Sequence, residues 1–330
     1  MIWRHAVREP IRYGFAVGRV RVLESRMLSS GTYERLLDAA DFAEQKRVLS
    51  DSVYGRFLED AETTDDVERA LDAALDELYA FLESANLPRP VLRFFRVRYD
   101  YPNLAGRLKA ELLGVPAEEL YVDLGSVPVE VITGPPAQLP PFLKSLYRTL
   151  SAEGAEVTEE DITAATDRAL YADLSASAEA SKSPFLAGLA ALMADLANVK
   201  AILRARMKGL RQPDVARLLI EGGAVPVDDL LALYSQPIDG LTEALARLPL
   251  FAGVSAEQLA DTANLDVLAD DLVVRYLRRA RRIATGPEPV IGYVMARQAE
   301  VIMLRTLLIG RLSGVPSDVL RRRLRQRYEE

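Results

Sequence analysis

The sequence predicts an all-α fold made of three similar helical domains. Ala, Leu, Arg and Glu dominate the composition, while Gly and Pro fall in short clusters, a distribution that favours helices joined by tight connections. No segment is predicted to be a regular strand of a sheet. A helical signature recurs three times along the chain, and the length of 330 residues fits two or three domains. Together these observations predict three versions of one helical unit.

The signature is an acidic residue, an Asn or Met three positions later, and a Gly eleven positions after that. Apolar residues follow the second position at intervals of four, which places them on one helical face that we expect to be buried. Each Gly is expected to end its helix in the left-handed conformation. The alternative of three unrelated amphipathic helices stays open, because apolar matches of this kind are common. The copies are Asp100, Asn103, Leu104, Leu108, Leu112, Gly114; Asp195, Asn198, Val199, Leu203, Met207, Gly209; and Glu300, Met303, Leu304, Leu308, Leu312, Gly314.

The three signatures and the Pro-rich and Gly-rich segments between them set the expected domain boundaries. We predict domains at residues 1–121, 122–221 and 222–330. The segment 122–141 is the clearest linker, because it contains five Pro and two Gly residues, and its apolar run 129–132 is compatible with a short extended segment. The helices expected in chain order lie at 19–28, from Tyr33, at 64–84, at the first signature, at 142–152, and at the second and third signatures.

Several helix starts carry recognisable capping residues. Thr158 with Asp161 resembles a capping box, and Ser255 with Gln258 forms another. Ser183 before Pro184 is expected to be an N-cap. The Pro-rich run 285–289 is expected to introduce the last signature helix.

Charge and composition exclude several classes of function. The net charge of −7 argues against a nucleic-acid partner. The chain has no Cys and a single His, His5, so disulfides and His-based metal or catalytic sites are not expected. The most apolar stretch, 185–199, is short and contains Asp195, so no membrane span is expected. Arg4 near the start argues against a signal peptide, and we expect a cytoplasmic protein.

Paired acidic residues are the only candidates for a catalytic site. Asp65 and Asp66 would need a third acid at position 69 to resemble the metal-binding motif of helical terpenoid synthases, and that position is Arg69. The pairs at 228–229 and 270–271 also lack partners at a productive spacing. Acids at helix starts are usually caps. The sequence therefore predicts no catalytic residue, no cofactor and no metal, and a magnesium-dependent helical enzyme is disfavoured.

Two groups of residues are candidates for contact with a partner protein or for bonds between helices. One group comprises acids, amides and an arginine on the signature helices, whose polar groups either satisfy buried backbone where helices cross or contact a partner. The other comprises two Arg runs, at 275–282 and 321–327, which are either solvated helix surfaces or contacts for an acidic protein. The candidate positions are Asp100, Asn103, Asp195, Asn198, Glu300, Arg305, Arg278, Arg279 and Arg282.

Motifs spread along nearly the whole chain resemble one family. They are Tyr13 with 19–21, the run Leu49 to Gly55, the run Arg98 to Leu104, Asn198 to Gly209, and Glu300 through Arg305 to Gly314. In this order they resemble the C subunit of the prokaryotic V-type (A/V-type) rotary ATPases, the counterpart of the d subunit of the eukaryotic V-ATPase.

The resemblance implies a funnel-shaped, all-helical protein with three similar domains about a pseudo-threefold axis. It implies a non-catalytic rotor protein that caps the cytoplasmic end of the proteolipid ring and holds the central stalk, which consists of the D and F subunits. Such a protein transmits torque between ATP turnover and proton or sodium transport, binds no nucleotide itself, and lies peripherally on the cytoplasmic face of the membrane.

Two positions depart from the family pattern. Pro102 stands where the family has a helix-compatible residue, so the first signature helix is expected to start or kink there. Met303 replaces a polar residue, which weakens a shared binding role for the three positions. The Arg residues after 275 are expected contacts for ring or stalk. An all-helical scaffold or adaptor unrelated to rotary ATPases is the alternative.

Overall fold

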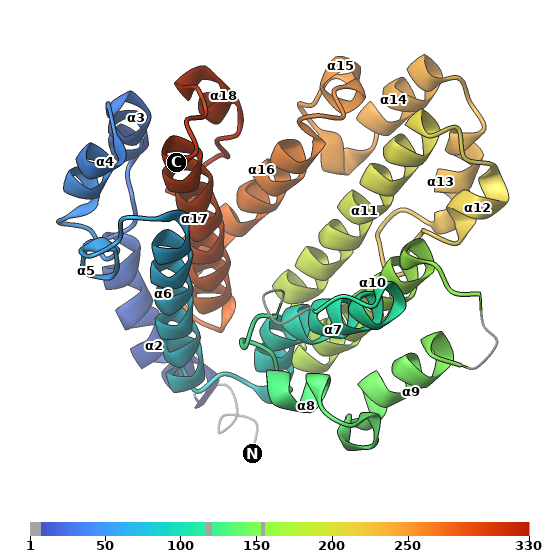
Figure 1. Cartoon of the computed structure of the whole chain (residues 1–330), viewed down its shortest axis with the longest axis horizontal. Coiled ribbons are helices and arrows are strands. Elements are labelled where there is room, and N and C mark those ends of the chain that lie inside the picture. The colour runs from blue at the N-terminus through green and yellow to red at the C-terminus, as the bar shows by residue number, and fades with distance from the viewer. Residues whose placement is uncertain (1–7, 117–120, 153–155, 330) are drawn as a thin grey trace. The chain divides into compact units, whose positions relative to one another are not determined.

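A computed structural model describes residues 8–116, 121–152 and 156–329. Within these ranges the secondary structure is helical and contains no strand, which confirms the all-α class (Figure 1). The expectations that rest on Arg4 and His5 concern residues outside the described ranges. The chain divides into two compact units. Unit 1 combines Met1–Leu87 with Ala263–Glu330, and unit 2 is the continuous segment Pro88–Thr262.

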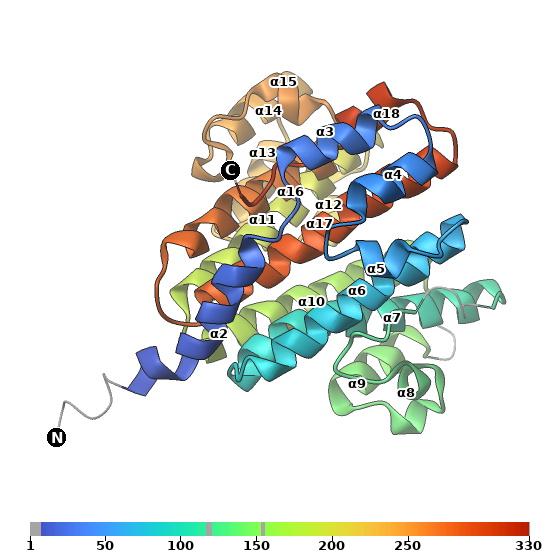
Figure 2. The same ribbon diagram turned by 90° about the vertical axis from the view of Figure 1, so that its left-hand side faces the viewer.

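Unit 1 is organised around one long helix near the C-terminal end of the chain. Helix α17 buries residues along most of its length, and it packs against helices from both ends of the sequence. Figure 2 shows α4 lying along α17, and α3 packs against α4 and α18. The elements are α2 (Arg8–Glu24), α3 (Ser30–Asp38), α4 (Phe42–Leu49), α5 (Gly55–Leu58), α6 (Thr64–Ser84), α16 (Leu265–Leu277), η4 (Arg278–Arg282), α17 (Glu288–Leu312) and α18 (Ser317–Arg322).

The core of unit 1 joins α17 to α6, α2 and the C-terminal segment. The rings of Phe81 on α6 and Tyr293 on α17 meet edge to face, with centroids 5.8 Å apart. Gly292 permits a close approach at the same level, since a Cβ there would lie 2.6 Å from the Cβ of Ala280 and 2.8 Å from the hydroxyl of Tyr328. A side chain at this position would therefore separate α17 from η4.

Unit 2 is built on three long helices. Helices α7 and α10 pack along each other, and α11 packs on α10. A partly buried salt bridge joins the first pair, in which Nε of Arg93 donates to Asp173 at 2.7 Å. The elements are α7 (Arg89–Leu113), α8 (Val129–Thr133), η2 (Pro136–Gln138), α9 (Pro141–Leu150), α10 (Glu159–Ser181), α11 (Pro184–Met207), α12 (Gln212–Ala216), α13 (Val227–Tyr234), α14 (Ile238–Ala246), η3 (Pro249–Phe251) and α15 (Ala256–Ala260).

The three signature helices α7, α11 and α17 end in the same way. Gly114, Gly209 and Gly314 have φ angles of 65°, 66° and 71°, in the left-handed region. In each copy the residue after the Gly donates its N–H to the carbonyl four residues before the Gly, at 3.1, 3.0 and 2.8 Å. This 6→1 bond is the mark of a Schellman ending and confirms the predicted stop.

The apolar face of the signature helices is buried at only two of its three predicted positions. The first two positions of every copy are at most 4% exposed. The third positions differ, because Leu112 is 47% exposed, Met207 is 66% exposed and Leu312 is partly exposed. They stand in the last turn, beyond the part of each helix that packs in the core, so the prediction of a fully buried face was wrong there.

The local capping predictions are confirmed, and two other local expectations need correction. Capping boxes form at Thr158 and Ser255, and Ser183 caps α11. The run 129–132 is the helical turn α8 rather than an extended segment, because its ends are held by side chains of α7, as described below. The first helix ends at Glu24, before Leu28.

Helix α7 begins at Arg89 and continues through Pro102, so that Pro does not start the helix. A Pro inside a helix removes one backbone hydrogen bond. Pro102 is exposed, and its neighbours Asp100 and Asn103 are buried and bonded to a loop. These side-chain bonds fix the helix on both sides of the interruption.

Helix α11 is the only described helix whose length and composition would allow it to cross a membrane. The apolar stretch predicted to be short is therefore part of a 24-residue helix. Within its most apolar window, 56% of the residues are buried inside the protein. Asp195 lies in its middle and binds a loop of the same unit, as in the core helix of a globular domain.

Candidate functional site

The first signature helix uses two buried side chains to hold the loop that precedes α8. The carboxylate of Asp100 accepts the backbone N–H groups of Ser126 and Val127 at 2.8 and 3.0 Å, and the hydroxyl of Ser126. The amide of Asn103 pairs with the backbone of Val122 in both directions, at 2.8 and 3.0 Å. These bonds satisfy loop groups that would otherwise be buried without partners.

The second signature helix repeats this arrangement with the loop that precedes α13. Asp195 accepts the N–H groups of Ala224 and Val225 at 3.0 and 3.1 Å. Asn198 donates to the carbonyl of Ile220 at 2.8 Å and accepts its N–H at 2.7 Å. The matching geometry gives the sequence repeat a structural meaning, since the acid and the amide together bind an extended loop.

The third copy binds a segment from the opposite end of the chain. Glu300 on α17 accepts the N–H of Leu28 at 2.6 Å and the hydroxyl of Tyr54 at 2.7 Å, and it forms a buried salt bridge with Arg297. Leu28 directly precedes Ser29, the N-cap of α3. Met303, at the Asn position, is buried and apolar. The N-terminal segment thus takes the place that the following loop has in the other copies.

Arginines on the same helices hold the far ends of the short helices. Arg107 of α7 donates to the carbonyls of Ile132 and Gly134 at the end of α8, at 2.6 and 2.8 Å. Arg206 of α11 donates to Gln236 after α13 at 2.9 Å, and Arg311 of α17 donates to Leu37 in α3 at 2.7 Å. The last carbonyls of a helix lack partners within it, so Arg107 and Arg311 satisfy such groups of α8 and α3, whereas Arg206 holds the turn that follows α13. Each signature helix therefore holds a short helix at both ends, and we call these three arrangements the junctions.

A glycine in two of the junctions was missed by the sequence analysis. A Cβ on Gly125 would lie 2.3 Å from an oxygen of Asp100, and one on Gly223 would lie 2.1 Å from an oxygen of Asp195. The carboxylate occupies the space of the missing side chain. The loops share a pattern that was available in the sequence, Gly-Ser-Val-Pro-Val at 125–129 and Gly-Ala-Val-Pro-Val at 223–227. Treating 122–141 as a linker concealed this repeat.

Burial shifts the pKa values of three junction groups. It raises the pKa of Asp100 and of Asp195 above the ordinary value, and the hydrogen bonds from the loops oppose that shift only in part. Burial also raises the pKa of the Tyr54 hydroxyl well above its ordinary value, and the negative charge of Glu300 raises it further. Tyr54 therefore stays protonated and donates its hydrogen bond to Glu300.

The described residues offer no group of three His, Asp or Glu side chains that could hold a metal ion. Asp66, one of the paired acids, closes the capping box of α6 with Thr63. Asp270 binds Arg325 at 2.8 Å, and Asp271 accepts the N–H of Gln326 at 2.5 Å. These acids have structural partners within unit 1.

Comparison with known proteins matches the sequence to one family. The family model described as the ATP synthase (C/AC39) subunit matches residues 16–323, nearly the whole chain and all three junctions. The chain belongs to the ATP synthase (C/AC39) subunit family. The resemblance found in the sequence motifs is thereby confirmed.

Curated relatives of this C/AC39 family member are distant but align over almost their full length. The chain is 24% identical to the C subunit of the V-type sodium ATPase of Enterococcus hirae, over 94% of this chain and 97% of the relative. It is 23% identical to the C subunit of the A-type ATP synthase of Methanocaldococcus jannaschii, over 94% and 85%. It is 26% identical to the corresponding A-type ATP synthase protein of a Desulfurococcus species, over 93% and 87%.

The remaining candidate positions of this C/AC39 family member lie in unit 1, and they differ in exposure. Arg305 on α17 binds Glu68 and Asp72 of α6, at 2.5 and 2.8 Å. Arg278 donates twice to the carbonyl of Arg327, at 3.0 and 2.6 Å, and so fixes the C-terminal segment.

Arg279 and Arg282 are exposed at the surface of η4. The guanidinium of Arg279 lies 4.8 Å from the ring centre of Tyr276. Among the Arg positions proposed as contacts, these two have their charge most available to a partner. Arg278 and Arg305 instead bind groups of their own unit.

Proposed function

We propose that the chain is the non-catalytic rotor subunit of a V/A-type ATPase. It caps the cytoplasmic end of the proteolipid ring and seats the central stalk, and it transmits torque between ATP turnover and proton or sodium transport. In this role it lies peripherally on the cytoplasmic face of the membrane. Its partners are the proteolipid ring and the D and F subunits of the stalk.

The family match over residues 16–323 is the single observation that carries this proposal. The chain also spans 97% of the length of its E. hirae V-type sodium ATPase relative, so no large part of that relative lacks a counterpart. The junctions support a mechanical role, because buried hydrogen bonds and close packing resist deformation under load. A coupling protein needs this stiffness and needs no catalytic group.

We infer that the exposed arginines of η4 take part in contact with an acidic surface of the ring or stalk. Replacing Arg279 and Arg282 with Glu is expected to weaken assembly about tenfold or more at low salt and to reduce its salt dependence, because exposed charge pairs are screened by ions. The matched control is Arg211→Glu with Arg247→Glu, two exposed arginines of unit 2. Unchanged assembly and salt dependence in the η4 variant would remove η4 from the interface.

A binding experiment without nucleotide tests the rotor assignment. The purified chain is immobilised and challenged separately with the D–F stalk complex and with detergent-solubilised proteolipid ring from the same source. Stable binding to both is expected. Binding to neither by a sample with a helical circular dichroism spectrum and a cooperative thermal transition would reject the rotor role and favour an unrelated helical scaffold.

A further inference from the structure

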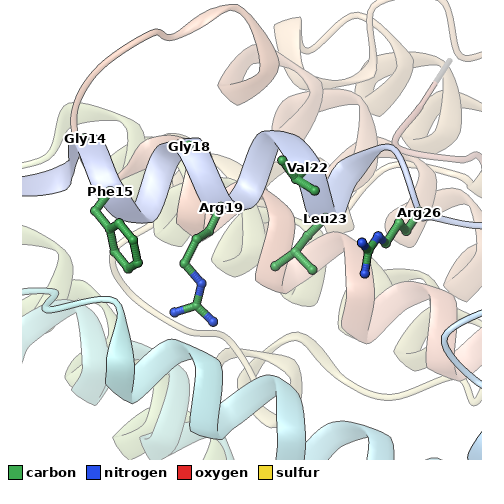
Figure 3. A pocket seen from close by; sticks show the side chains of 7 residues that line it. All are labelled: Gly14, Phe15, Gly18, Arg19, Val22, Leu23 and Arg26. Atoms are coloured by element: carbon green, nitrogen blue, oxygen red, sulfur yellow. The ribbon is translucent and has the colours of Figure 1, made fainter.

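The outer face of α2 combines exposed apolar side chains with two glycines, which leave the helix backbone uncovered. Phe15 is 76% exposed and Val22 is 56% exposed, whereas Val17 and Val20 on the opposite face are buried in unit 1. The face forms a shallow groove of about 540 Å³, and Figure 3 shows that every residue lining it comes from this one helix and the turn that follows it. We call this surface the α2 outer face; it consists of Gly14, Phe15, Gly18, Arg19, Val22, Leu23 and Arg26.

No contact with the described residues explains the two glycines of this face. A Cβ on Gly14 or Gly18 would meet no atom of the described residues within 4 Å, and neither glycine has a positive φ. Gly in a helix interior is destabilising relative to Ala. At Gly292, by contrast, neighbouring atoms exclude a Cβ. A spacing of four places Gly14 and Gly18 on one side of the helix, where they allow another backbone to approach closely.

The charge of the face is positive and lacks an acidic partner among the described residues. Arg19 donates to the hydroxyl of Ser84 at 3.1 Å and lies 4.8 Å from the ring centre of Phe81, and no described carboxylate pairs with it. Arg26 is exposed and forms no ion pair with a described residue. Glu24 is turned away, toward Arg21 and the hydroxyl of Tyr328.

The positive charge of the face indicates which kind of protein could bind there. A second copy packed on the same face would bring Arg19 and Arg26 against arginines, with no carboxylate on either side to compensate. Like charges across an interface are unfavourable, whereas carboxylates on a partner would be attracted and oriented. A partner with acidic residues at the edge of an apolar contact surface therefore fits the face best.

We propose that the α2 outer face docks one helix of another protein of the complex, with small or apolar residues along its contact side and carboxylates at its edges. The partner backbone lies over Gly14 and Gly18, the side chains of Phe15 and Val22 pack on its flanks, and the carboxylates reach Arg19 and Arg26. That the partner belongs to the ATPase complex rests on the proposed function; its chemistry rests on this face alone.

Cysteine labelling of the assembled complex tests this docking. The chain has no Cys, so Val22→Cys introduces a single thiol on the exposed face, and Ala43→Cys on exposed α4 is the control. On assembly, the maleimide reaction of the thiol at position 22 is expected to slow about tenfold or more while that of the control is retained. A benzophenone attached at position 22 is expected to cross-link to an acid-containing helical peptide of another protein of the complex, identified by mass spectrometry.

A second set of variants separates binding from folding. Gly14→Ala and Gly18→Ala are expected to raise the melting temperature of the free chain by about 1–2 °C each, because Ala favours the helix. The pair is nonetheless expected to weaken assembly about tenfold, since the added methyl groups hold the partner helix away. Gly31→Ala, on exposed α3 with ordinary contacts around its Cβ, is the control and is expected to leave assembly unchanged.

The outcomes distinguish this inference from the proposed function. A Val22→Cys chain that assembles while its thiol stays fully reactive, or that cross-links only to lipid or to a second copy, overturns the docking face alone. Tight assembly of the Gly14→Ala, Gly18→Ala variant overturns it as well. Wild-type chain that joins neither stalk nor ring overturns the proposed function together with the partner named here.

Discussion

At the scale of single residues, the junctions depend on space as much as on hydrogen bonds. Asp100 and Asp195 reach their loops only because Gly125 and Gly223 leave room for a carboxylate oxygen. The oxygens are fixed by backbone N–H groups, so they cannot move aside without breaking those bonds. The acid of the signature and the glycine of the loop therefore form one unit, although they are more than 20 residues apart in the sequence.

Alanine substitution of the junction glycines provides a direct test. Gly223→Ala is expected to lower the free energy of unfolding by about 2 kcal/mol, because the new methyl group displaces the carboxylate of Asp195 from its donors. Gly18→Ala, in open space on α2, is expected to raise that free energy by about 0.5–1 kcal/mol. Urea denaturation of both variants checks the opposite signs. An unchanged free energy of unfolding for Gly223→Ala would mean that the loop moves to accommodate the methyl group and keeps its hydrogen bonds to Asp195.

Acids in this chain respond to pH in opposite directions. The backbone N–H of Glu62 and the hydroxyl and N–H of Thr63 lower the pKa of Asp66 to about 2. The stability that Asp66 contributes is therefore present above about pH 4 and lost as pH falls toward 2. Burial raises the pKa of Asp195. Its contribution is present below about pH 4 and lost as pH rises through the raised value.

Single substitutions separate these two contributions. Unfolding free energies of the wild type, Asp66→Asn and Asp195→Asn are measured by urea denaturation from pH 3 to pH 6. As pH rises, the stability advantage of the wild type over Asp66→Asn is expected to grow, whereas its advantage over Asp195→Asn is expected to shrink. Equal pH slopes for the two differences would contradict the assigned protonation behaviour.

At the scale of elements, helices that depend on local signals could be predicted from the sequence. Elements whose conformation depends on distant residues could not. Helix α6 spans the predicted residues 64–84, because its start is fixed by a local capping box and its buried face by its own periodicity. The residues of the helical turn α8 were interpreted as part of a linker that was compatible with an extended segment. Its conformation depends on Asp100 and Arg107, which lie more than 20 residues earlier in the chain.

The contact between the N-terminal segment and α17 in the third junction also could not be predicted from the sequence. Leu28 and Glu300 are separated by 272 positions, and nothing in the local sequence of either identifies the other as its partner. The signature identified Glu300 as an equivalent of Asp100. The partners of Glu300 could be identified only from the fold. Met303 offers no amide, and α17 holds its segment through the contacts of Glu300 with Tyr54 and Arg297 instead.

The third junction predicts how the N-terminal segment is held on α17. Glu300→Gln removes the negative charge that Arg297 and the hydroxyl of Tyr54 share, and leaves a buried guanidinium without its counter-charge. A loss of about 3 kcal/mol in unfolding free energy is expected. Hydrogen exchange, followed by mass spectrometry, is expected to accelerate in residues 28–54. The exposed substitution Glu243→Gln in unit 2 serves as the control, and unchanged exchange in 28–54 would show that α3 and α4 are held without Glu300.

At the scale of the whole molecule, two divisions of the chain compete. The sequence predicts three consecutive domains, 1–121, 122–221 and 222–330, whereas the contacts give unit 2 as one continuous segment between the two parts of unit 1. Cutting after residue 121 would separate Asp100 from Ser126, and cutting after 221 would separate Asp195 from Ala224. Three similar domains about a threefold axis stay a proposal, in which the third domain would recruit the N-terminal segment.

Isolated fragments decide between these divisions. The fragment 88–262 contains both of its junctions complete, together with the packing of α7, α10 and α11, so it is expected to be helical and to unfold cooperatively in urea. The fragment 122–221 retains α10 and α11 but lacks α7 and the loop that binds Asp195, and it is expected to show no cooperative transition because a buried carboxylate loses its donors. Circular dichroism of both fragments gives the comparison. Cooperative unfolding of 122–221 alone would favour consecutive domains, and would mean that the loop bonds of α11 add to a domain already stable without them.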